Sequence, residues 1–476
     1  MSGLRKNISY SILLTLSTYL VPLVVFPYIS RVLGPEGIGT IDSVEYVINY
    51  AVVCSMMGLT TLGVREIARH KDDPQRLKET FSGLFYLNLI STACVVVALS
   101  VLVLAIPQFY EKKEMFFIGL FKIIANMFWI EWFFKGIENF KYITIRSLIL
   151  RTLFVLAVFC FVTTQEDSHI YYAIWVGLTC MNAVCNWLYR RNYTHLSVRK
   201  VKLKPFIKPF ILLGLFGFLS AVYTQLNVTY LSFVASEEQV GYYTTATRLY
   251  GVIIALFSTI TAVMIPRMSI LLKEQREEEM KNLVNKTFAL LFCFAFPVVA
   301  FMEIFAADVI TLFAGEAFLP AVLPMRIVML QLFIIGTEQI FLLQVLIPGQ
   351  KENDMLKCVA MGIVACAAVN LLLVEQYQSI GSALAWVGAE LAVFCGAAYY
   401  VKKHYGILFP IKLFGTCLVW SLPFWGIGWA VTTSIESLFV KLAVAGVLFS
   451  GYALVMTHRF LGLGLDKIID KIRRKK

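Results

Sequence analysis

The sequence is poor in charged residues. Of its 476 residues only 15% are Asp, Glu, Lys or Arg, whereas 59% are apolar. A water-soluble chain needs about a quarter of its residues charged to cover its surface. The composition therefore excludes a disordered chain, a collagen, a coiled coil and a secreted disulfide scaffold. Its 37 phenylalanines and 22 tyrosines against only five histidines indicate a protein that faces lipid.

Signatures of enzymes and metal sites are missing as well. There is no Gly-rich phosphate loop followed by Lys and Ser or Thr, no HExxH and no Gly-x-Ser-x-Gly elbow. The five histidines lie in or beside predicted loops without metal-ligand spacing. The ten cysteines stand singly in apolar runs, and even Cys180 and Cys185 do not form a zinc spacing. We therefore predict no catalytic residues, no metal and no cofactor, and a protein that is not an enzyme.

Long apolar runs are what the sequence has in place of these features. A helix of about 20 apolar residues crosses the ~30 Å hydrocarbon core of a bilayer. The first run is not expected to be a cleaved signal peptide, because no small-residue cleavage site follows it. We predict an all-α integral membrane protein with about fourteen spans: 8–30, 40–64, 80–106, 115–135, 143–163, 170–190, 209–235, 241–265, 287–306, 322–347, 357–375, 380–400, 413–433 and 439–459.

The basic residues predict how the chain is oriented. With the N-terminus inside, the inside segments hold 35 of the 42 Lys and Arg residues, the outside segments five and the spans two. Cytoplasmic loops carry such an excess. Both termini are therefore predicted to be cytoplasmic, and the net charge of +12 needs no nucleic-acid partner. The basic tail 462–476 is predicted to form a short amphipathic helix on anionic lipid.

The chain contains an internal repeat with a shift of 202 residues. Gly39 then aligns with Gly241, each after an acidic turn, and Arg65 aligns with Arg267. Six spans separate the copies, so both lobes enter the membrane the same way up, and a substrate site is expected between them. The predicted domains are an N-terminal lobe at 1–208, a C-terminal lobe at 209–412, and two extra helices with the basic tail at 413–476. Chance similarity between apolar stretches is the alternative.

Arg248 is the most informative polar residue in the predicted spans. It lies about 10 Å inside the membrane at 1.5 Å per residue, on a helix face of small and polar residues that includes Thr244. Charges at this depth are costly and face the protein interior or water. We interpret Arg248 as a cation of a substrate cavity; a buried ion pair between helices is the alternative.

Other polar residues of the spans are weaker candidates. For substrate binding we add Lys122, Asn126 and Gln225. For coupling to H⁺ or Na⁺ we consider the carboxyl groups of Asp42, Glu45, Glu338 and Glu390, although Asp42 and Glu45 could simply be solvated near the outer interface. We interpret Glu131 and Lys135 as a structural ion pair at i and i+4 of one helix.

Two prolines in the first span suggest a hinge. Pro22 and Pro27 each remove a backbone donor. We predict that the helix bends there and helps to open a lateral gap.

Two sequence blocks resemble a known family. The stretches Pro27–Gly39 and Met57–Arg69 are similar to the opening of bacterial polysaccharide (O-antigen type) lipid-linked oligosaccharide flippases, which belong to the multidrug/oligosaccharidyl-lipid/polysaccharide exporter superfamily. Weaker similarity follows at Val240–Tyr250, Ile265–Ser269 and Ile347–Glu352. The resemblance therefore extends over most of the chain in the same order.

The resemblance implies a fourteen-helix alternating-access carrier in the bacterial cytoplasmic (inner) membrane. Its substrate would be an oligosaccharide on undecaprenyl pyrophosphate, moved to the outer leaflet. Its partners would be this lipid and the bilayer, with other polysaccharide assembly proteins left open. A cation-coupled drug exporter of the same superfamily and an integral-membrane glycan enzyme remain as alternatives; for the enzyme, Asp42 and Glu45 are the only candidate pair.

Overall fold

The computed structural model describes residues 2–197 and 203–461. The tail 462–476, for which the sequence predicts an amphipathic helix, lies outside the described residues. The chain forms two compact units, unit 1 at Met1–Gly241 and unit 2 at Tyr242–Lys476. Each unit is described by itself below.

The described residues form helices and no strands. Short 3₁₀ turns at Gln165–Asp167, Arg190–Asn192 and Glu316–Ala321 and a π-helical segment at Gln339–Leu346 join some of them. The α-helices are α1 (Ser2–Met56), α2 (Leu59–His70), α3 (Pro74–Ala105), α4 (Pro107–Glu111), α5 (Lys113–Trp129), α6 (Glu131–Gly136), α7 (Phe140–Phe161), α8 (Ser168–Tyr189), α9 (Lys204–Val234), α10 (Glu237–Lys273), α11 (Glu277–Ile304), α12 (Ala306–Phe313), α13 (Val322–Met329), α14 (Gln331–Glu338), α15 (Glu352–Tyr405), α16 (Ile411–Ser434) and α17 (Leu438–Leu461).

The prediction of an all-α membrane protein is confirmed. Eleven helical segments of the described chain are long and apolar enough to cross a membrane. One of them, Glu352–Tyr405, holds two predicted spans, and Leu20–His70 holds the predicted span 40–64 and only the later part of 8–30. The predicted span 170–190 is not among the eleven. The count of fourteen therefore stays a prediction. The range 40–64 was expected to be one helix, but the structure ends α1 at Met56 and begins α2 at Leu59.

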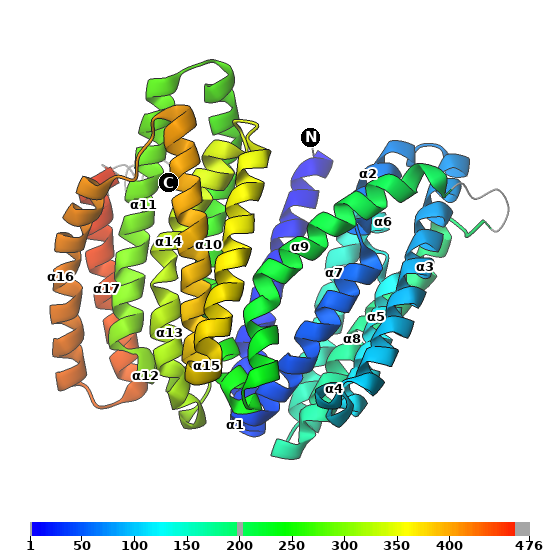
Figure 1. Cartoon of the computed structure of the whole chain (residues 1–476), viewed down its shortest axis with the longest axis horizontal. Helices are drawn as coiled ribbons and strands as arrows, with labels where there is room; N and C mark the ends of the chain where they lie inside the picture. The colour runs from blue at the N-terminus through cyan, green and yellow to red at the C-terminus, as the bar shows by residue number, and fades with distance from the viewer. Residues whose placement is uncertain (1, 198–202, 462–476) are drawn as a thin grey trace. The chain divides into compact units, whose positions relative to one another are not determined.

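Helix α15 is a helical hairpin rather than one rod. Its 54 residues would extend about 80 Å at 1.5 Å per residue, more than twice the ~30 Å hydrocarbon core. The backbone leaves helical geometry at Gln378, with φ 50°. On either side of this break, Gly381 packs against Val374, and Gly396 against Cys358. Figure 1 shows the two arms in yellow and orange, side by side in unit 2.

Helix α1 breaks in the same way, but not at its first two prolines. Pro22 and Pro27 lie within continuous helix, and the non-helical backbone is at Gly34, with φ 69°. Glycine adopts this left-handed conformation without a Cβ clash, and Pro35 follows directly. The hinge role of Pro22 and Pro27 stays a prediction.

Aromatic side chains fill the interior of each unit. In unit 1, Phe81 stacks on Trp132 with ring centroids 5.6 Å apart and meets Phe133 edge-on at 5.2 Å. In unit 2, Phe292 contacts Phe414 edge-on at 5.3 Å. Such pairs contribute about 0.5–1.5 kcal/mol each beyond the burial of their area. These contacts join α3 to α6 in unit 1 and α11 to α16 in unit 2.

Gly39 and Gly241, which the 202-residue repeat aligns, lie at a crossing of α1 with the start of α10. The first residues of α10, up to Gly241, belong to unit 1. A Cβ on Gly39 would lie 1.7 Å from the carbonyl oxygen of Glu237, and one on Gly241 would lie 2.2 Å from that of Pro35. The 202-residue shift relates Gly39 to Gly241 and Pro35 to Glu237. The two contacts are therefore equivalent under the repeat. A side chain also holds the crossing together: the Ser43 hydroxyl donates to Glu237 Oε2 at 2.6 Å.

We expect Gly39→Ala and Gly241→Ala to prevent correct folding. Each added methyl group would overlap a backbone carbonyl, which cannot move aside as a flexible side chain can. The measurement is the fraction of detergent-extracted protein that elutes as one sharp peak in size-exclusion chromatography. Gly426→Ala is the matched control, because a Cβ there meets nothing within 4 Å. Normal elution of Gly39→Ala would contradict the described contact.

Candidate functional site

A buried ion pair lies at the centre of the first polar cluster, in unit 1. Helix α5 carries Lys122 and the second arm of α1 carries Glu45, and the two side chains form a salt bridge. The Lys122 ammonium also donates to Asn49 Oδ1 at 3.2 Å. The Tyr172 hydroxyl donates to Glu45 Oε2 at 3.1 Å, and the Trp175 ring lies 5.5 Å from Lys122 Nζ.

The structure thus brings together two residues for which the sequence predicts different roles. Lys122 was expected to bind substrate and Glu45 to bind an ion or to be solvated. Glu45 is only 4% exposed, so the charges neutralise each other inside the protein. An anionic substrate that approached Lys122 would have to compete with this carboxylate.

A second cluster, in unit 2, consists of two carboxyl groups. Glu338 on α14 and Glu390 on α15 are 6% and 5% exposed, and their carboxyl groups are close enough to share a hydrogen bond. The Trp386 indole donates to Glu390 Oε1 at 2.8 Å. The buried hydroxyl of Tyr250 lies near enough to both carboxyl groups to interact with them electrostatically, and it has no hydrogen-bond partner among the described residues.

This carboxyl pair differs from the first cluster because it has no cation. Within residues 2–197 and 203–461, neither Glu338 nor Glu390 forms a salt bridge, and Glu338 Oε1 is buried without a hydrogen-bond partner. Like charges in a buried site disfavour each other's ionisation. The arrangement can therefore hold a proton or a small cation between the two groups.

The remaining predicted site residues lie on different units. Asn126 and Gln225 are partly buried in unit 1, and Asp42 is buried there. Thr244 is buried and Arg248 partly buried on the α10 segment of unit 2. Their roles stay predictions.

A third polar network was missed by the sequence analysis. Arg146 on α7 was counted only among the cytoplasmic basic residues, yet it is 6% exposed. Its guanidinium donates to Asn186 Oδ1 and, at 3.3 Å, to Glu131 Oε2. The predicted pair of Glu131 with Lys135 is confirmed at 2.9 Å. The position of Arg146, six residues inside α7, was the signal that could have revealed it.

A break in the helix creates this network. The left-handed backbone at Ile130, with φ 30°, separates α5 from α6. The break leaves the carbonyl of Trp129 without its usual helical partner, and the Asn186 side chain donates to it. The same break brings Glu131 to the start of α6, where the Trp129 indole donates to its carboxylate at 3.1 Å.

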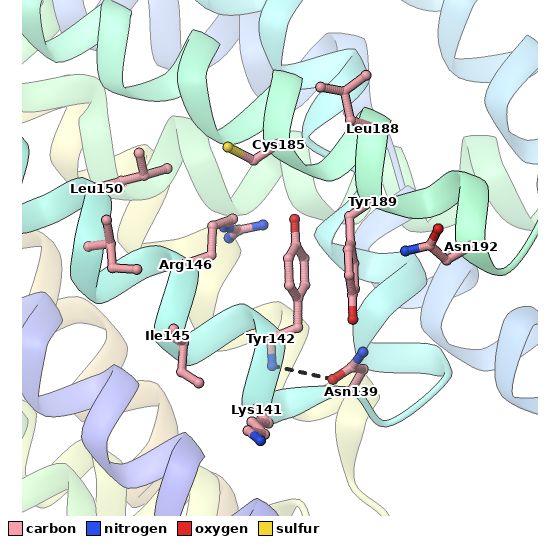
Figure 2. Close-up of a pocket in the computed structure, with 11 residues that line it drawn as sticks. Asn139, Lys141, Tyr142, Ile145, Arg146, Leu150, Cys185, Leu188, Tyr189 and Asn192 are labelled. Carbon is pink, nitrogen blue, oxygen red and sulfur yellow. Dashed lines mark hydrogen bonds between the residues drawn. The ribbon is translucent and has the colours of Figure 1, made fainter.

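A pocket of about 740 Å³ lies beside this network, between α7 and α8 (Figure 2). The rings of Tyr142 and Tyr189 stack there with centroids 3.9 Å apart. Its lining is formed by Asn139, Lys141, Tyr142, Ile145, Arg146, Ile149, Leu150, Cys185, Leu188, Tyr189 and Asn192.

Comparison with known proteins identifies the family. A family model described as "Polysaccharide biosynthesis protein" matches residues 4–272, more than half of the chain. The chain belongs to this family. A relative from Escherichia coli (strain K12), named "Putative O-antigen transporter", is 22% identical over 416 residues, which are 84% of this chain and 97% of the relative. The family resemblance noted from the sequence is thereby confirmed.

Solved structures show the same fold. The lipid II flippase MurJ, in an inward closed conformation, superposes with a TM-score of 0.76 at 14% identity and covers 95% of this chain and 98% of its own. A multidrug resistance MATE family transporter of the MOP superfamily, in an inward-facing conformation, gives 0.59 at 15% identity, covering 84% and 94%. An outward-facing conformation of a multidrug resistance MATE family transporter of the MOP superfamily gives 0.55 at 16% identity, covering 83% and 94%. The expectation of a transport protein rather than an enzyme is confirmed.

We expect single substitutions in the Lys122–Glu45 pair to destabilise the protein and the double substitution to restore most of the loss. Lys122→Met or Glu45→Gln alone leaves one buried charge unpaired, which costs about 3–5 kcal/mol. Thermal unfolding of the purified single and double variants measures this coupling.

The exposed pair Lys71–Glu138 is the control. Its side chains are 34% and 59% exposed, so Lys71→Met should cost less than about 1 kcal/mol. If Lys122→Met unfolds at the wild-type temperature, Glu45 does not depend on Lys122 for its charge compensation.

Proposed function

We propose that this protein flips an oligosaccharide linked to undecaprenyl pyrophosphate from the cytoplasmic to the outer leaflet of the bacterial inner membrane. The observation that carries the proposal is the match over 97% of the length of the Escherichia coli relative, whose name is that of an O-antigen transporter. Both termini would lie in the cytoplasm, in keeping with the distribution of Lys and Arg. The glycan would serve polysaccharide biosynthesis of the O-antigen or capsule type.

The charge of such a substrate agrees with the polar residues of the spans. A lipid diphosphate carries negative charge and a hydrated glycan, so its head group needs a polar path with a cation. Arg248 can bind a phosphate or a sugar carboxylate through two parallel hydrogen bonds. Thr244, one turn away on α10, supplies a neutral polar group to the same helix face, and Asn126 and Gln225 are the neutral candidates in unit 1.

Alternating access is the proposed mechanism. The chain consists of two compact units, and MATE family transporters that share the fold have been solved in inward-facing and outward-facing conformations. The lipid tail would remain in the bilayer while the head group passes through the protein. A bend at Pro22 and Pro27 would help to open the lateral gap for the tail.

The coupling ion would bind at Glu338 and Glu390. Net transport needs an energy source, and the sequence has no ATP-binding loop. The two buried carboxyl groups interact with each other and with the Tyr250 hydroxyl, and within the described residues they form no salt bridge. Binding of H⁺ or Na⁺ would reduce the negative charge of the two carboxyl groups and permit their burial in one conformation. In the other conformation the carboxyl groups would be exposed and would release the ion.

We expect the purified protein in vesicles to flip a fluorescent lipid-linked oligosaccharide. Arg248→Ala should lower the rate about 10- to 150-fold, which corresponds to the loss of a charged hydrogen-bonded contact of about 1.5–3 kcal/mol. Arg248→Lys should keep partial activity, because it retains the charge but not the planar guanidinium.

The same vesicles distinguish the alternatives. Export of cationic drugs without flipping of the lipid would replace the proposal by a drug exporter. If Arg248→Ala fails to accumulate and neutralising an acidic residue restores it, Arg248 belongs to a structural ion pair.

A second prediction concerns coupling. Glu338→Gln with Glu390→Gln should abolish acceleration of flipping by an imposed H⁺ or Na⁺ gradient, while the protein stays folded because amides keep the shape and remove the buried charge. Glu352→Gln is the control, since Glu352 is exposed at the start of α15. Gradient-driven flipping at the wild-type rate in the double variant would exclude this pair as the coupling site.

A further inference from the structure

The pocket between α7 and α8 has no part in the proposed transport cycle. It lies wholly within unit 1, beside the Arg146 network, and its volume is about 740 Å³. This is within the usual range of ligand pockets, about 300–1,000 Å³. Its lining therefore tells which chemical class of ligand it suits.

The polar part of the lining suits an anion. Only two of the eleven lining residues are charged, Lys141 and Arg146, and both are cations. Two buried polar atoms at the pocket have no hydrogen-bond partner in the described chain, the Tyr142 hydroxyl and Arg146 Nε. In Figure 2 the Tyr142 ring projects between Arg146 and Tyr189. Because Arg146 is already paired with Glu131, the pocket offers a ligand the charge of Lys141 and the unused hydroxyl donor of Tyr142.

The rest of the lining suits a hydrocarbon chain. Ile145, Ile149 and Leu188 line the pocket and are still 44%, 56% and 51% exposed. They lie on spans of a membrane protein, so their exposed surfaces meet lipid. From Lys141 near the start of α7 to Leu150 is nine residues, about 13 Å along the helix axis. A chain that enters beside Lys141 can therefore continue along α7 into the hydrocarbon core.

We propose that this pocket binds an anionic glycerophospholipid of the bilayer. Lys141 would hold the phosphate, the Tyr142 hydroxyl, which in Figure 2 points away from Lys141 toward Cys185, would donate to an ester oxygen of the same lipid, and one acyl chain would lie along Ile145, Ile149 and Leu188. Basic pockets between membrane helices bind anionic lipid head groups in this way. The predicted orientation places the polar end, formed by the start of α7 and the end of α8, at the cytoplasmic leaflet. The apolar share of the lining argues against a hydrated glycan as occupant.

A cysteine in the pocket provides a readout that is independent of transport. Cys185 lines the pocket, whereas Cys180 on the same helix does not, and both thiols are free and partly exposed. Purified protein in detergent is alkylated with a maleimide while phosphatidylglycerol is titrated, and each cysteine is followed by peptide mass spectrometry. We expect phosphatidylglycerol to slow labelling of Cys185 but not of Cys180.

Other lipids identify the occupant. Phosphatidylcholine should protect Cys185 only at much higher concentration. Equal protection by phosphatidylcholine would show a mere hydrocarbon groove and overturn the proposal. Protection by undecaprenyl phosphate but not by phosphatidylglycerol would also overturn it, because the pocket would then belong to the transported lipid. Absence of protection by any lipid refutes the site.

Substitutions of the head-group contacts test the assignment of residues. A lysine near a lipid surface changes affinity by about fivefold, so Lys141→Ala should weaken phosphatidylglycerol binding about fivefold and Lys141→Glu about thirtyfold. Tyr142→Phe keeps the stacked ring and should weaken binding about fivefold through loss of one hydrogen bond.

Lys78→Glu is the matched control for charge reversal. Lys78 is an exposed lysine on α3 that does not line the pocket. Its variant should bind phosphatidylglycerol like the wild type. If Lys78→Glu and Lys141→Glu weaken phosphatidylglycerol binding equally, the effect comes from the net charge of the protein. This result would overturn the assignment to this pocket.

Discussion

The cost of an unsatisfied polar group in a lipid bilayer is the constraint on which the rest of this structure depends. Hydrocarbon offers no hydrogen bonds, so a spanning chain must satisfy its backbone within helices and its charged side chains within the protein. Lys122 and Glu45 meet this requirement as a pair. Arg146 meets it with Asn186 and Glu131, at a point where a helix break frees a carbonyl group.

The carboxyl pair of unit 2 is an exception to this rule, and exceptions inside a membrane usually mark function. Glu338 and Glu390 face each other, with Trp386 as a donor and no salt bridge in the described chain. A carboxylate that only stabilises the fold is expected to have a cation as its partner, as Glu45 has Lys122 in unit 1. The contrast separates charges that stabilise the fold from charges that can exchange an ion.

The sequence was sufficient for the fold class because hydrophobic length is a local property. Apolar runs predicted the helices, and the Lys and Arg distribution predicted an orientation. The repeat shift already aligned Gly39 with Gly241, which the structure places at one reciprocal contact. Helix breaks were harder to predict. The sequence indicates a bend at Pro22 and Pro27, whereas the backbone breaks at Gly34, whose φ of 69° favours a glycine.

The sequence by itself determined that this is an all-helical membrane protein, its resemblance indicated the family that the comparison confirmed, and its polar residues within the spans included Glu45, Lys122, Glu338 and Glu390. Only the tertiary structure decided which of them are partners. Residues 77 positions apart, such as Glu45 and Lys122, meet because helices pack across the bundle, and a helical periodicity tells only which face a side chain occupies. Pairing depends on how those faces are apposed, which is a non-local property of the folded chain.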